Sequence, residues 1–312
     1  MASGRVNDCL TSPGPARYRL HRVSRFAYHQ PESLTEAVAL ASRFGAEASF
    51  LAGGTDLIVQ IERGRIAPRH VIGLHRVPGL ASIEVGGRIA LGAGVTHRSI
   101  ERRPELAGAL RCLVEGAEVI GGHQVRNVAT VGGNLANASP AADLVPCLLA
   151  LDGVVTLLGP GGERDLPVDH FLLGPNHTAR RPDELLTRVS LPPPPPRTAT
   201  AFLKAGRRRA MEIAVVCVAV RLTLDASLER CLEARVALGA VAPTGVRVPA
   251  AERLLEGHPV GDEAFRRAAE AAQRACRPID DVRASAAFRL HLVGVLVRRA
   301  LARSVERARL AA

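Results

Sequence analysis

The sequence is poor in aromatic side chains and nearly free of lysine. It has no tryptophan, and aromatic residues make up 3% of its 312 residues. Lys204 is the one lysine among 41 basic residues, and the formal net charge is +11. A basic chain can bind nucleic acid through its phosphates, but such surfaces combine clustered basic residues with aromatic residues that stack on bases. Because the arginines are spread along the chain and aromatics are scarce, we predict no nucleic-acid partner.

Long apolar runs and clustered cysteines are also missing. No segment approaches the roughly 18 consecutive apolar residues of a membrane span, so no span is predicted. Residues 1–25 hold several arginines but no apolar segment of signal-peptide type, and we expect a disordered extension on a cytoplasmic protein. The six cysteines show no C-x-x-C pair and no short spacing that binds zinc or an iron–sulfur cluster. We expect buried thiols, no metal site in this chain, and any such cluster in another subunit.

Length and apolar content point to several lobes. The chain of 312 residues is 47% hydrophobic, and a single core stops growing at roughly 250–300 residues. Five consecutive prolines, 192–196, form a stiff stretch without N–H donors that marks a boundary or a surface crossing. Beyond them, the patterns predict an α+β lobe.

Two segments carry adjacent glycines among small and polar residues. The first spans residues 51–57 around Gly53-Gly54, and the second spans residues 130–143 around Gly132-Gly133. Because glycine has no Cβ atom, an anionic group can approach the backbone N–H donors closely, as in a phosphate-binding loop. Two such loops can hold one diphosphate. The simpler alternative is that each pair is a turn between a strand and the next element.

A third glycine pattern fails its test. Gly92 and Gly94 begin like the dinucleotide fingerprint G-x-G-x-x-G, but His97 stands where the third glycine belongs, and no acidic residue follows on a strand at the required distance. We therefore predict strand-end glycines. His97 and His123 are the candidates for acid–base chemistry, but we expect surface or internally satisfied histidines and predict no catalytic residue.

Local patterns predict most of the remaining elements. Ser33 and Glu36 form a capping box and Gly45 a stop, which together define a helix. Gly86-Gly87 between two apolar runs predicts a two-residue hairpin. In the final helix, we expect a buried face that includes Phe288. The predicted helices span 33–44, a short stretch from 57, 107–120, 144–151, 262–276 and 281–310, and the predicted strands span 48–51, 70–74, 83–85, 88–91, 154–158, 164–168, 213–224 and 235–241.

The order and spacing of these segments resemble the FAD-binding subunits of the molybdenum hydroxylases, the group that includes xanthine dehydrogenase and aerobic carbon monoxide dehydrogenase. The resemblance covers residue 26 to about residue 301. Residues 51–57 are similar to the family's first FAD loop, and residues 130–143 are similar to its second. Two later segments, 182–186 and 202–214, resemble the elements that close over the flavin.

The resemblance implies an α+β fold. It consists of a two-subdomain FAD-binding domain of the vanillyl-alcohol-oxidase (PCMH) type and a small C-terminal α+β domain. The expected boundaries are 26–78 and 79–191 for the two subdomains, 192–197 for the proline-rich connection and 198–312 for the C-terminal domain.

The resemblance also implies which residues hold FAD. The diphosphate is expected against the N–H groups of residues 53–56 and 130–134, with Thr55 and Thr130 as hydroxyl donors. Asp143 is expected to contact FAD, although its simpler role is a helix cap. Lys204 is expected beside the flavin, because arginine has replaced lysine everywhere else. The full predicted set is Leu51, Ala52, Gly53, Gly54, Thr55, Asp56, Leu57, Ile120, Thr130, Val131, Gly132, Gly133, Asn134, Asp143, Leu186 and Lys204.

In the family that the chain resembles, FAD collects electrons from two [2Fe–2S] clusters in one partner subunit, and a molybdopterin cofactor in a large subunit oxidises the substrate. The resemblance therefore implies an oxidoreductase subunit that carries FAD, works in a dimer of heterotrimers and passes electrons to a final acceptor. A self-sufficient FAD oxidase or reductase of the same fold is the alternative. A basic nucleic-acid-binding protein is the remote one.

Overall fold

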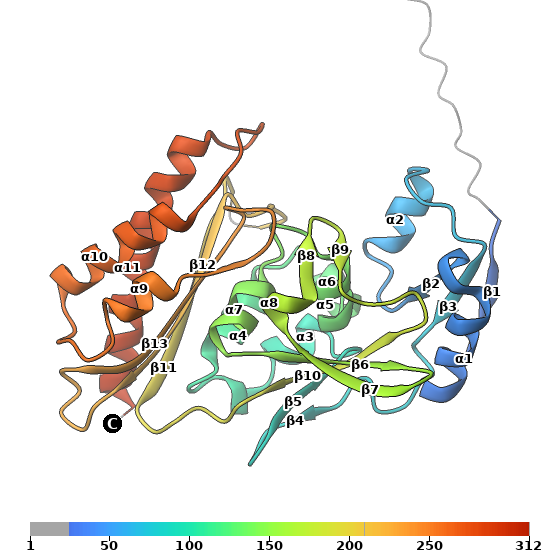
Figure 1. Cartoon of the computed structure of the whole chain (residues 1–312), viewed down its shortest axis with the longest axis horizontal. Helices are drawn as coiled ribbons and strands as arrows, with labels where there is room; N and C mark the ends of the chain where they lie inside the picture. The colour runs from blue at the N-terminus through green and yellow to red at the C-terminus, as the bar shows by residue number, and fades with distance from the viewer. Residues whose placement is uncertain (1–24, 209, 312) are drawn as a thin grey trace, which may run out of the picture.

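The computed structural model describes residues 25–208 and 210–311. Three larger sheets follow one another across the molecule, with the C-terminal end of the chain at one side and the N-terminal sheet at the other (Figure 1), and a two-stranded sheet is the fourth in the described residues. The extension predicted for residues 1–25 lies outside the described residues, apart from Arg25. No helix within the described ranges is long and apolar enough to cross a membrane.

The N-terminal sheet is parallel and carries the first glycine segment. Strands β1 (Ala27–His29), β3 (His70–Gly73) and β2 (Ala48–Leu51) lie in that order. Helix α1 (Leu34–Phe44) confirms the predicted capping box, because the Ser33 hydroxyl accepts the Glu36 N–H at 3.1 Å. Helix α2 (Leu57–Glu62) connects β2 to β3, in agreement with the short helix predicted from residue 57 between two strands. The glycine segment therefore lies between a strand end and a helix start.

The middle sheet has the order β4-β5-β10-β6-β7, and its pairs are antiparallel. The hairpin predicted at Gly86-Gly87 is confirmed, because β4 (Ile83–Glu84) pairs with β5 (Ile89–Gly92). The strands predicted at 154–158 and 164–168 also pair, as β6 (Val154–Gly159) and β7 (Gly162–Pro167). The central strand β10 (Leu185–Leu191) was not predicted. It ends at the residue before the prolines, because a proline cannot donate to the ladder.

Short helices cover this sheet, and one of them corrects a prediction. The second glycine segment was expected to be a loop, but residues Val131–Asn137 form helix α6. Thr130 caps it by accepting the Gly133 N–H at 3.0 Å, and Ala138 ends it in the left-handed conformation. A threonine cap and tight packing thus outweigh the low helix propensity of glycine. The neighbouring elements are α3 (His97–Glu101), α4 (Arg111–Glu118), α5 (His123–Val128), α7 (Leu144–Ala150), α8 (Val168–Phe171), β8 (Leu172–Gly174) and β9 (His177–Thr178).

The C-terminal sheet is antiparallel and is sandwiched between helices. Its strands are β11 (Thr198–Ala205), β12 (Val216–Leu224), β13 (Cys231–Gly239) and β14 (Val246–Arg247). Helices α9 (Pro249–Arg253), α10 (Asp262–Ala275) and α11 (Ala286–Leu310) cover its outer face, while α4 and α7 of the middle subdomain pack on its inner face (Figure 1). The C-terminal domain therefore shares a wall with the middle subdomain.

Two side-chain predictions have different outcomes. The five described cysteines are buried and unpaired, as predicted; Cys9 lies outside the described residues. The buried position predicted for Phe288 is wrong, because its side chain is 52% exposed. Arg289 points inward instead and donates to the Val215 carbonyl at 2.6 Å, while Asp281 pairs with it at 2.7 Å.

Candidate functional site

The glycine segments meet at one cavity of about 960 Å³. Its walls come from the end of β2 and the start of α2, the start of α3, the α5–α6 segment and the β8–β9 region. Leu51, Val131, Asp143 and Lys204 do not line it, whereas the other predicted residues do. These are Ala52, Gly53, Gly54, Thr55, Asp56, Leu57, Ile120, Thr130, Gly132, Gly133, Asn134 and Leu186.

Gly53 brings the first segment against the end of α5, just before the second segment. A Cβ atom at this position would overlap the carbonyl oxygen of Val128, the last residue of α5. Only glycine allows this approach of two backbones. The next residue, Gly54, has a φ of 72°, a conformation that other residues rarely adopt. These two positions therefore fix the shape of the loop.

The first segment offers a run of free donors, and in the second segment the Thr130 N–H also has no acceptor among the described residues. No acceptor among the described residues meets the backbone N–H groups of residues 53–56. In the second segment, the N–H groups of residues 131–134 are already used, for example by Gly132 to the Ala93 carbonyl at 2.8 Å and by Gly133 to Thr130. The expectation that both segments offer N–H groups to a diphosphate is therefore wrong for residues 131–134. The cause is the helix, whose first turn is capped and packed.

The two glycines of the second segment have different roles. A Cβ atom on Gly132 would lie 2.6 Å from the Ala93 Cβ atom, so Gly132 serves packing. On Gly133, a Cβ atom would meet only the Thr130 hydroxyl, at 3.1 Å. Gly133 lines the cavity, so a side chain at this position would fill space that is now open there.

Two residues that line the cavity also contain buried polar atoms without partners. Asn134 Oδ1 and His97 Nδ1 are buried and have no hydrogen-bond partner among the described residues, and both residues line the cavity. The prediction of a surface or satisfied histidine is wrong for His97, which is 1% exposed. It is confirmed for His123, an exposed residue whose Nδ1 lies 3.1 Å from Arg126 Nη2. Burying unpaired polar atoms costs stability, so both side chains keep hydrogen-bonding capacity that the described protein does not use.

Lys204 and Asp143 form a buried pair behind the wall. Lys204 Nζ lies 2.7 Å from Asp143 Oδ2, and both side chains are 9% exposed. The same ammonium donates to the carbonyls of Val119, at 3.2 Å, and Glu212, at 2.8 Å. Burial raises the pKa of Asp143 to about 6, against the opposing effect of Lys204. Asp143 makes no side-chain cap to α7, so the helix-cap alternative does not describe its hydrogen bonding.

Arg126 binds the backbone carbonyl of Ile120, the residue after Val119, and this arginine was not identified from the sequence. Its Nη1 donates to the Ile120 carbonyl at 3.2 Å, and its Nε pairs with Glu101 at 3.1 Å. Two cations, Lys204 and Arg126, thus hold the consecutive carbonyls of Val119 and Ile120. In a chain with so many arginines, nothing in the sequence distinguishes this one.

Arg180 is a second missed arginine of the cavity wall. Its guanidinium carbon lies 5.6 Å from the Phe50 ring centroid, and its Nη1 donates to the Glu184 carbonyl at 2.8 Å. Asn176 and His177 add polar groups beside it. The cavity therefore has a polar end as well as an apolar wall.

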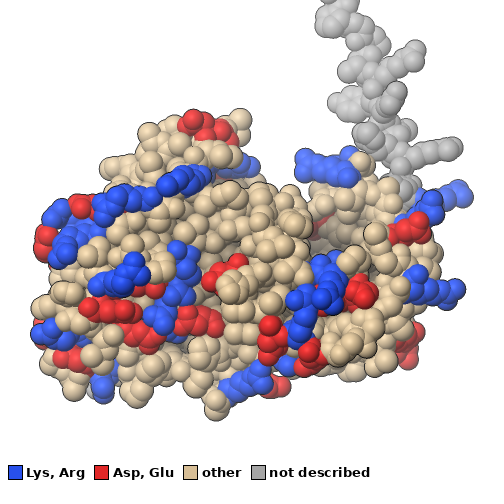
Figure 2. Space-filling model, viewed as in Figure 1, with Lys and Arg blue, Asp and Glu red and all other residues tan. Residues whose placement is uncertain are grey.

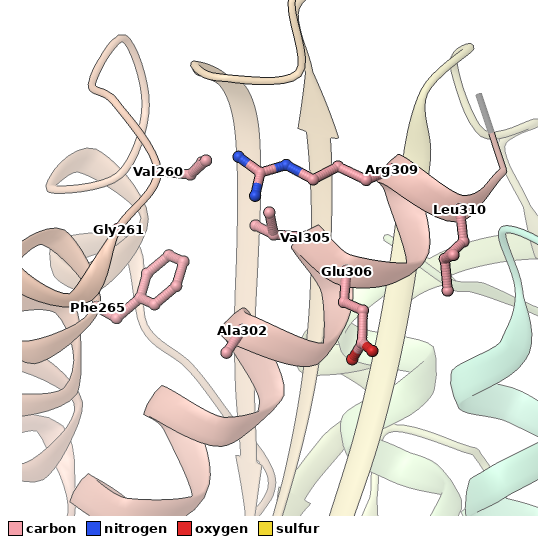
Figure 3. A pocket seen from close by; sticks show the side chains of 8 residues that line it. All are labelled: Val260, Gly261, Phe265, Ala302, Val305, Glu306, Arg309 and Leu310. Carbon is pink, nitrogen blue, oxygen red and sulfur yellow. The ribbon is translucent and has the colours of Figure 1, made fainter.

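A second cavity lies in the C-terminal domain, between the start of α10 and the end of α11 (Figure 3). It measures about 380 Å³, and its wall is mostly apolar, with Phe265 and Val305 at its centre and Glu306 and Arg309 at its rim. It is smaller and more apolar than the cavity at the glycine segments, so we do not take it as the main site.

Charge is mixed on the face of the molecule that Figure 2 shows. Arginines lie beside acidic residues there and do not gather in one continuous basic patch. Ion pairs are frequent among the described residues, for example Arg188 with Glu163 at 2.8 Å and Arg266 with Glu270 at 2.6 Å. This face does not have the continuous basic footprint of a nucleic-acid interface.

Comparisons with known proteins agree with this geometry. A family profile described as "FAD binding domain in molybdopterin dehydrogenase" matches residues 24–194, and one described as "CO dehydrogenase flavoprotein C-terminal domain" matches residues 201–304. The carbon monoxide dehydrogenase medium chain of Hydrogenophaga pseudoflava is 33% identical over 89% of this chain and 96% of its own length. The putative xanthine dehydrogenase FAD-binding subunit of Escherichia coli is 30% identical over 89% of this chain and 96% of its own length.

Solved structures show the same likeness. A chain of the carbon monoxide dehydrogenase from Hydrogenophaga pseudoflava superposes with a TM-score of 0.87 at 34% identity, covering 91% of this chain and 98% of that one. A chain of the enzyme from Oligotropha carboxidovorans gives a TM-score of 0.87 at 32% identity, covering 91% and 99%. The predicted fold class is thereby confirmed. The chain belongs to the FAD-binding subunits of the molybdenum hydroxylases, a family of oxidoreductases that includes carbon monoxide dehydrogenase and xanthine dehydrogenase.

Proposed function

We propose that this chain is the FAD-carrying electron-transfer subunit of a molybdenum hydroxylase complex. In this proposal, it takes electrons from the [2Fe–2S] clusters of an iron–sulfur subunit, while a large subunit with a molybdopterin cofactor oxidises the substrate. The chain then passes the electrons to a final acceptor, within a cytoplasmic dimer of heterotrimers. We also propose the domain boundaries that the sequence predicts.

The cavity between the glycine segments is the observation that carries the proposal. It combines free N–H donors at residues 53–56, a surface without a side chain at Gly133 and buried polar atoms that lack partners at Asn134 and His97. Such a cavity suits a long, polar and anionic ligand that also has flat apolar parts. FAD has that chemistry.

In our proposal, the chain holds the diphosphate with the first segment. The N–H groups of residues 53–56 are available, and Thr55 lies among them. From the second segment, side chains take part instead of N–H groups. The Thr130 hydroxyl accepts from Gly133, which leaves its own proton to donate, and the Asn134 amide adds an acceptor and donors. Ile120 and Leu186 offer the apolar surface.

Four predicted residues do not line the cavity and lie behind the residues that do: Leu51, Val131, Asp143 and Lys204. Lys204 links β11 of the C-terminal domain to the carbonyl of Val119 and thereby fixes the wall that Ile120 presents. The bound cofactor supplies the redox chemistry, and the protein supplies binding, orientation and electrostatics. A direct contact of these four residues with FAD stays a prediction.

The test compares the chain alone with the chain expressed together with its genomic neighbours. Alone, it should bind FAD and accept electrons from an artificial donor, but it should not oxidise purines, aldehydes, aromatic heterocycles or carbon monoxide. With an iron–sulfur and a molybdenum subunit, oxidation of one of these substrates should appear. The sequence has no cysteine spacing that would hold a cluster in this chain. Substrate oxidation by the chain alone would replace the proposal with a self-sufficient flavoenzyme.

A further inference from the structure

His97 occupies an unusual place for a histidine. It is the first residue of α3, follows the cap Thr96 and lines the cavity. Its side chain is 1% exposed, and its backbone N–H donates to the Ala129 carbonyl at 3.1 Å. The backbone is therefore tied to the residue before Thr130, and the imidazole is held in the cavity wall next to the second segment.

The imidazole has no hydrogen bond within the described residues. Nδ1 is fully buried and unpaired. Buried polar side-chain atoms nearly always have a partner, since leaving one without costs stability. An apolar side chain of similar size would avoid that cost at this position. The ring thus has hydrogen-bonding capacity that nothing in the described protein uses, on the wall of a ligand cavity.

The ring is also neutral. Burial, followed by the charge of Arg126, lowers the pKa of His97 to about 4. A neutral imidazole carries one N–H donor and one acceptor nitrogen, and no protein partner fixes which nitrogen has the proton. A ligand in the cavity can therefore select either tautomer.

We infer that His97 is a cofactor-binding residue whose imidazole hydrogen-bonds FAD from the cavity wall. The inference rests on the proposed function and adds a contact that the glycine segments do not provide. The ligand pairs Nε2, the ring nitrogen that is not among the fully buried atoms, while Nδ1 stays enclosed by protein. His97 therefore lowers the stability of the FAD-free protein and raises its affinity for FAD.

The experiment measures FAD affinity and thermal stability of the full chain and three variants. His97→Leu removes the hydrogen bond at nearly equal volume, and His97→Gln keeps a donor and an acceptor. His291→Leu, at an exposed position on α11, is the matched control. FAD is removed from each protein and titrated back while flavin fluorescence is followed.

His97→Leu should raise the dissociation constant of FAD about ten- to a hundredfold, the range expected for a lost hydrogen bond in a buried site. His97→Gln should raise it clearly less, and His291→Leu should leave it unchanged. Without FAD, His97→Leu should melt at the wild-type temperature or above. A parallel titration with ADP assigns the contact: an equal loss places it on the ADP half of FAD, and unchanged ADP affinity places it on the flavin half.

Wild-type affinity in His97→Leu would overturn the inference while leaving the proposed function intact. A lower melting temperature of FAD-free His97→Leu would also overturn it, because the histidine would then serve the fold. If the wild-type chain binds no FAD, the proposed function fails first. The two failures are therefore distinguishable.

Discussion

Replacing Lys204 by methionine should break the contact between the C-terminal domain and the cavity wall. The ammonium pairs with Asp143 at 2.7 Å and donates to the carbonyls of Val119 and Glu212. Methionine keeps most of the side-chain volume and removes the charge and all three interactions. Asp143 Oδ1 already lacks a partner, so the variant leaves both carboxylate oxygens buried without one.

The expected loss is large because the pair is buried. Removing one partner of a buried ion pair costs about 3–5 kcal/mol, whereas an exposed pair contributes about 0–1 kcal/mol. Part of the loss depends on pH. Burial raises the folded-state pKa of Asp143 above its ordinary 3.8, to about 6, although Lys204 lowers it; without Lys204 that pKa rises further, so the variant bears an extra penalty at high pH, where the wild-type carboxyl is ionised, and this extra penalty fades as pH falls below 6. Lys204→Met should therefore be less destabilising at pH 5 than at pH 8.

Urea unfolding at pH 7.5 measures this loss, and a double-mutant cycle assigns it. Lys204→Met combined with Asp143→Leu should recover at least about 1 kcal/mol relative to Lys204→Met alone, because the unpaired charge is gone. Arg69→Met is the matched control, since its pair with Glu47 has a similar distance of 2.9 Å but an arginine side chain that is 75% exposed. A loss below about 1 kcal/mol for Lys204→Met, or strict additivity in the cycle, would refute the reasoning.

Three further predictions concern the cavity. Gly133→Val should leave the melting temperature of the FAD-free chain nearly unchanged but abolish FAD binding, because its Cβ meets only Thr130 before it enters the cavity; retained flavin occupancy would show that this space is not needed. Gly53→Ala should destabilise the fold by about 1–3 kcal/mol in urea unfolding, since the new atom overlaps the Val128 carbonyl; wild-type stability would contradict the close approach. As pH falls from 7 to 4.5, the free energy of unfolding of FAD-free His97→Leu should rise by up to about 3 kcal/mol relative to that of the wild type. The reason is that His97 in the unfolded wild type is protonated below pH 6.5, whereas the folded residue, with its pKa lowered to about 4, stays neutral. Parallel pH profiles of the two proteins would exclude a buried neutral histidine.

The elements that local chemistry defines were predictable. The capping box at Ser33 and Glu36 gave the start of α1, and Gly86-Gly87 gave the β4–β5 hairpin, because in both cases residues close in sequence make the deciding contacts. The first glycine segment was recognised for the same reason. Its free N–H groups go with a backbone conformation at Gly54 that glycine adopts readily and other residues rarely adopt.

Elements that depend on distant partners were not predictable. Strand β10 lies between β5 and β6 and is buried along nearly its whole length, so its sequence shows no alternation. Helix α6 forms where glycines predicted a loop, since the packing of Gly132 on Ala93 is a tertiary contact. The roles of Arg126 and His97 depend on neighbours from other elements, and no pattern in the sequence announces them.

The measurement that tests the central claim most directly is the cofactor content of the purified chain. The protein should show the absorption bands of a flavin, and the cofactor released on denaturation should co-elute with FAD at about one molecule per chain. Gly133→Val, purified in the same way, should be colourless and folded. A wild-type chain that is folded yet carries no flavin, and that does not take up FAD when it is added, would contradict the account.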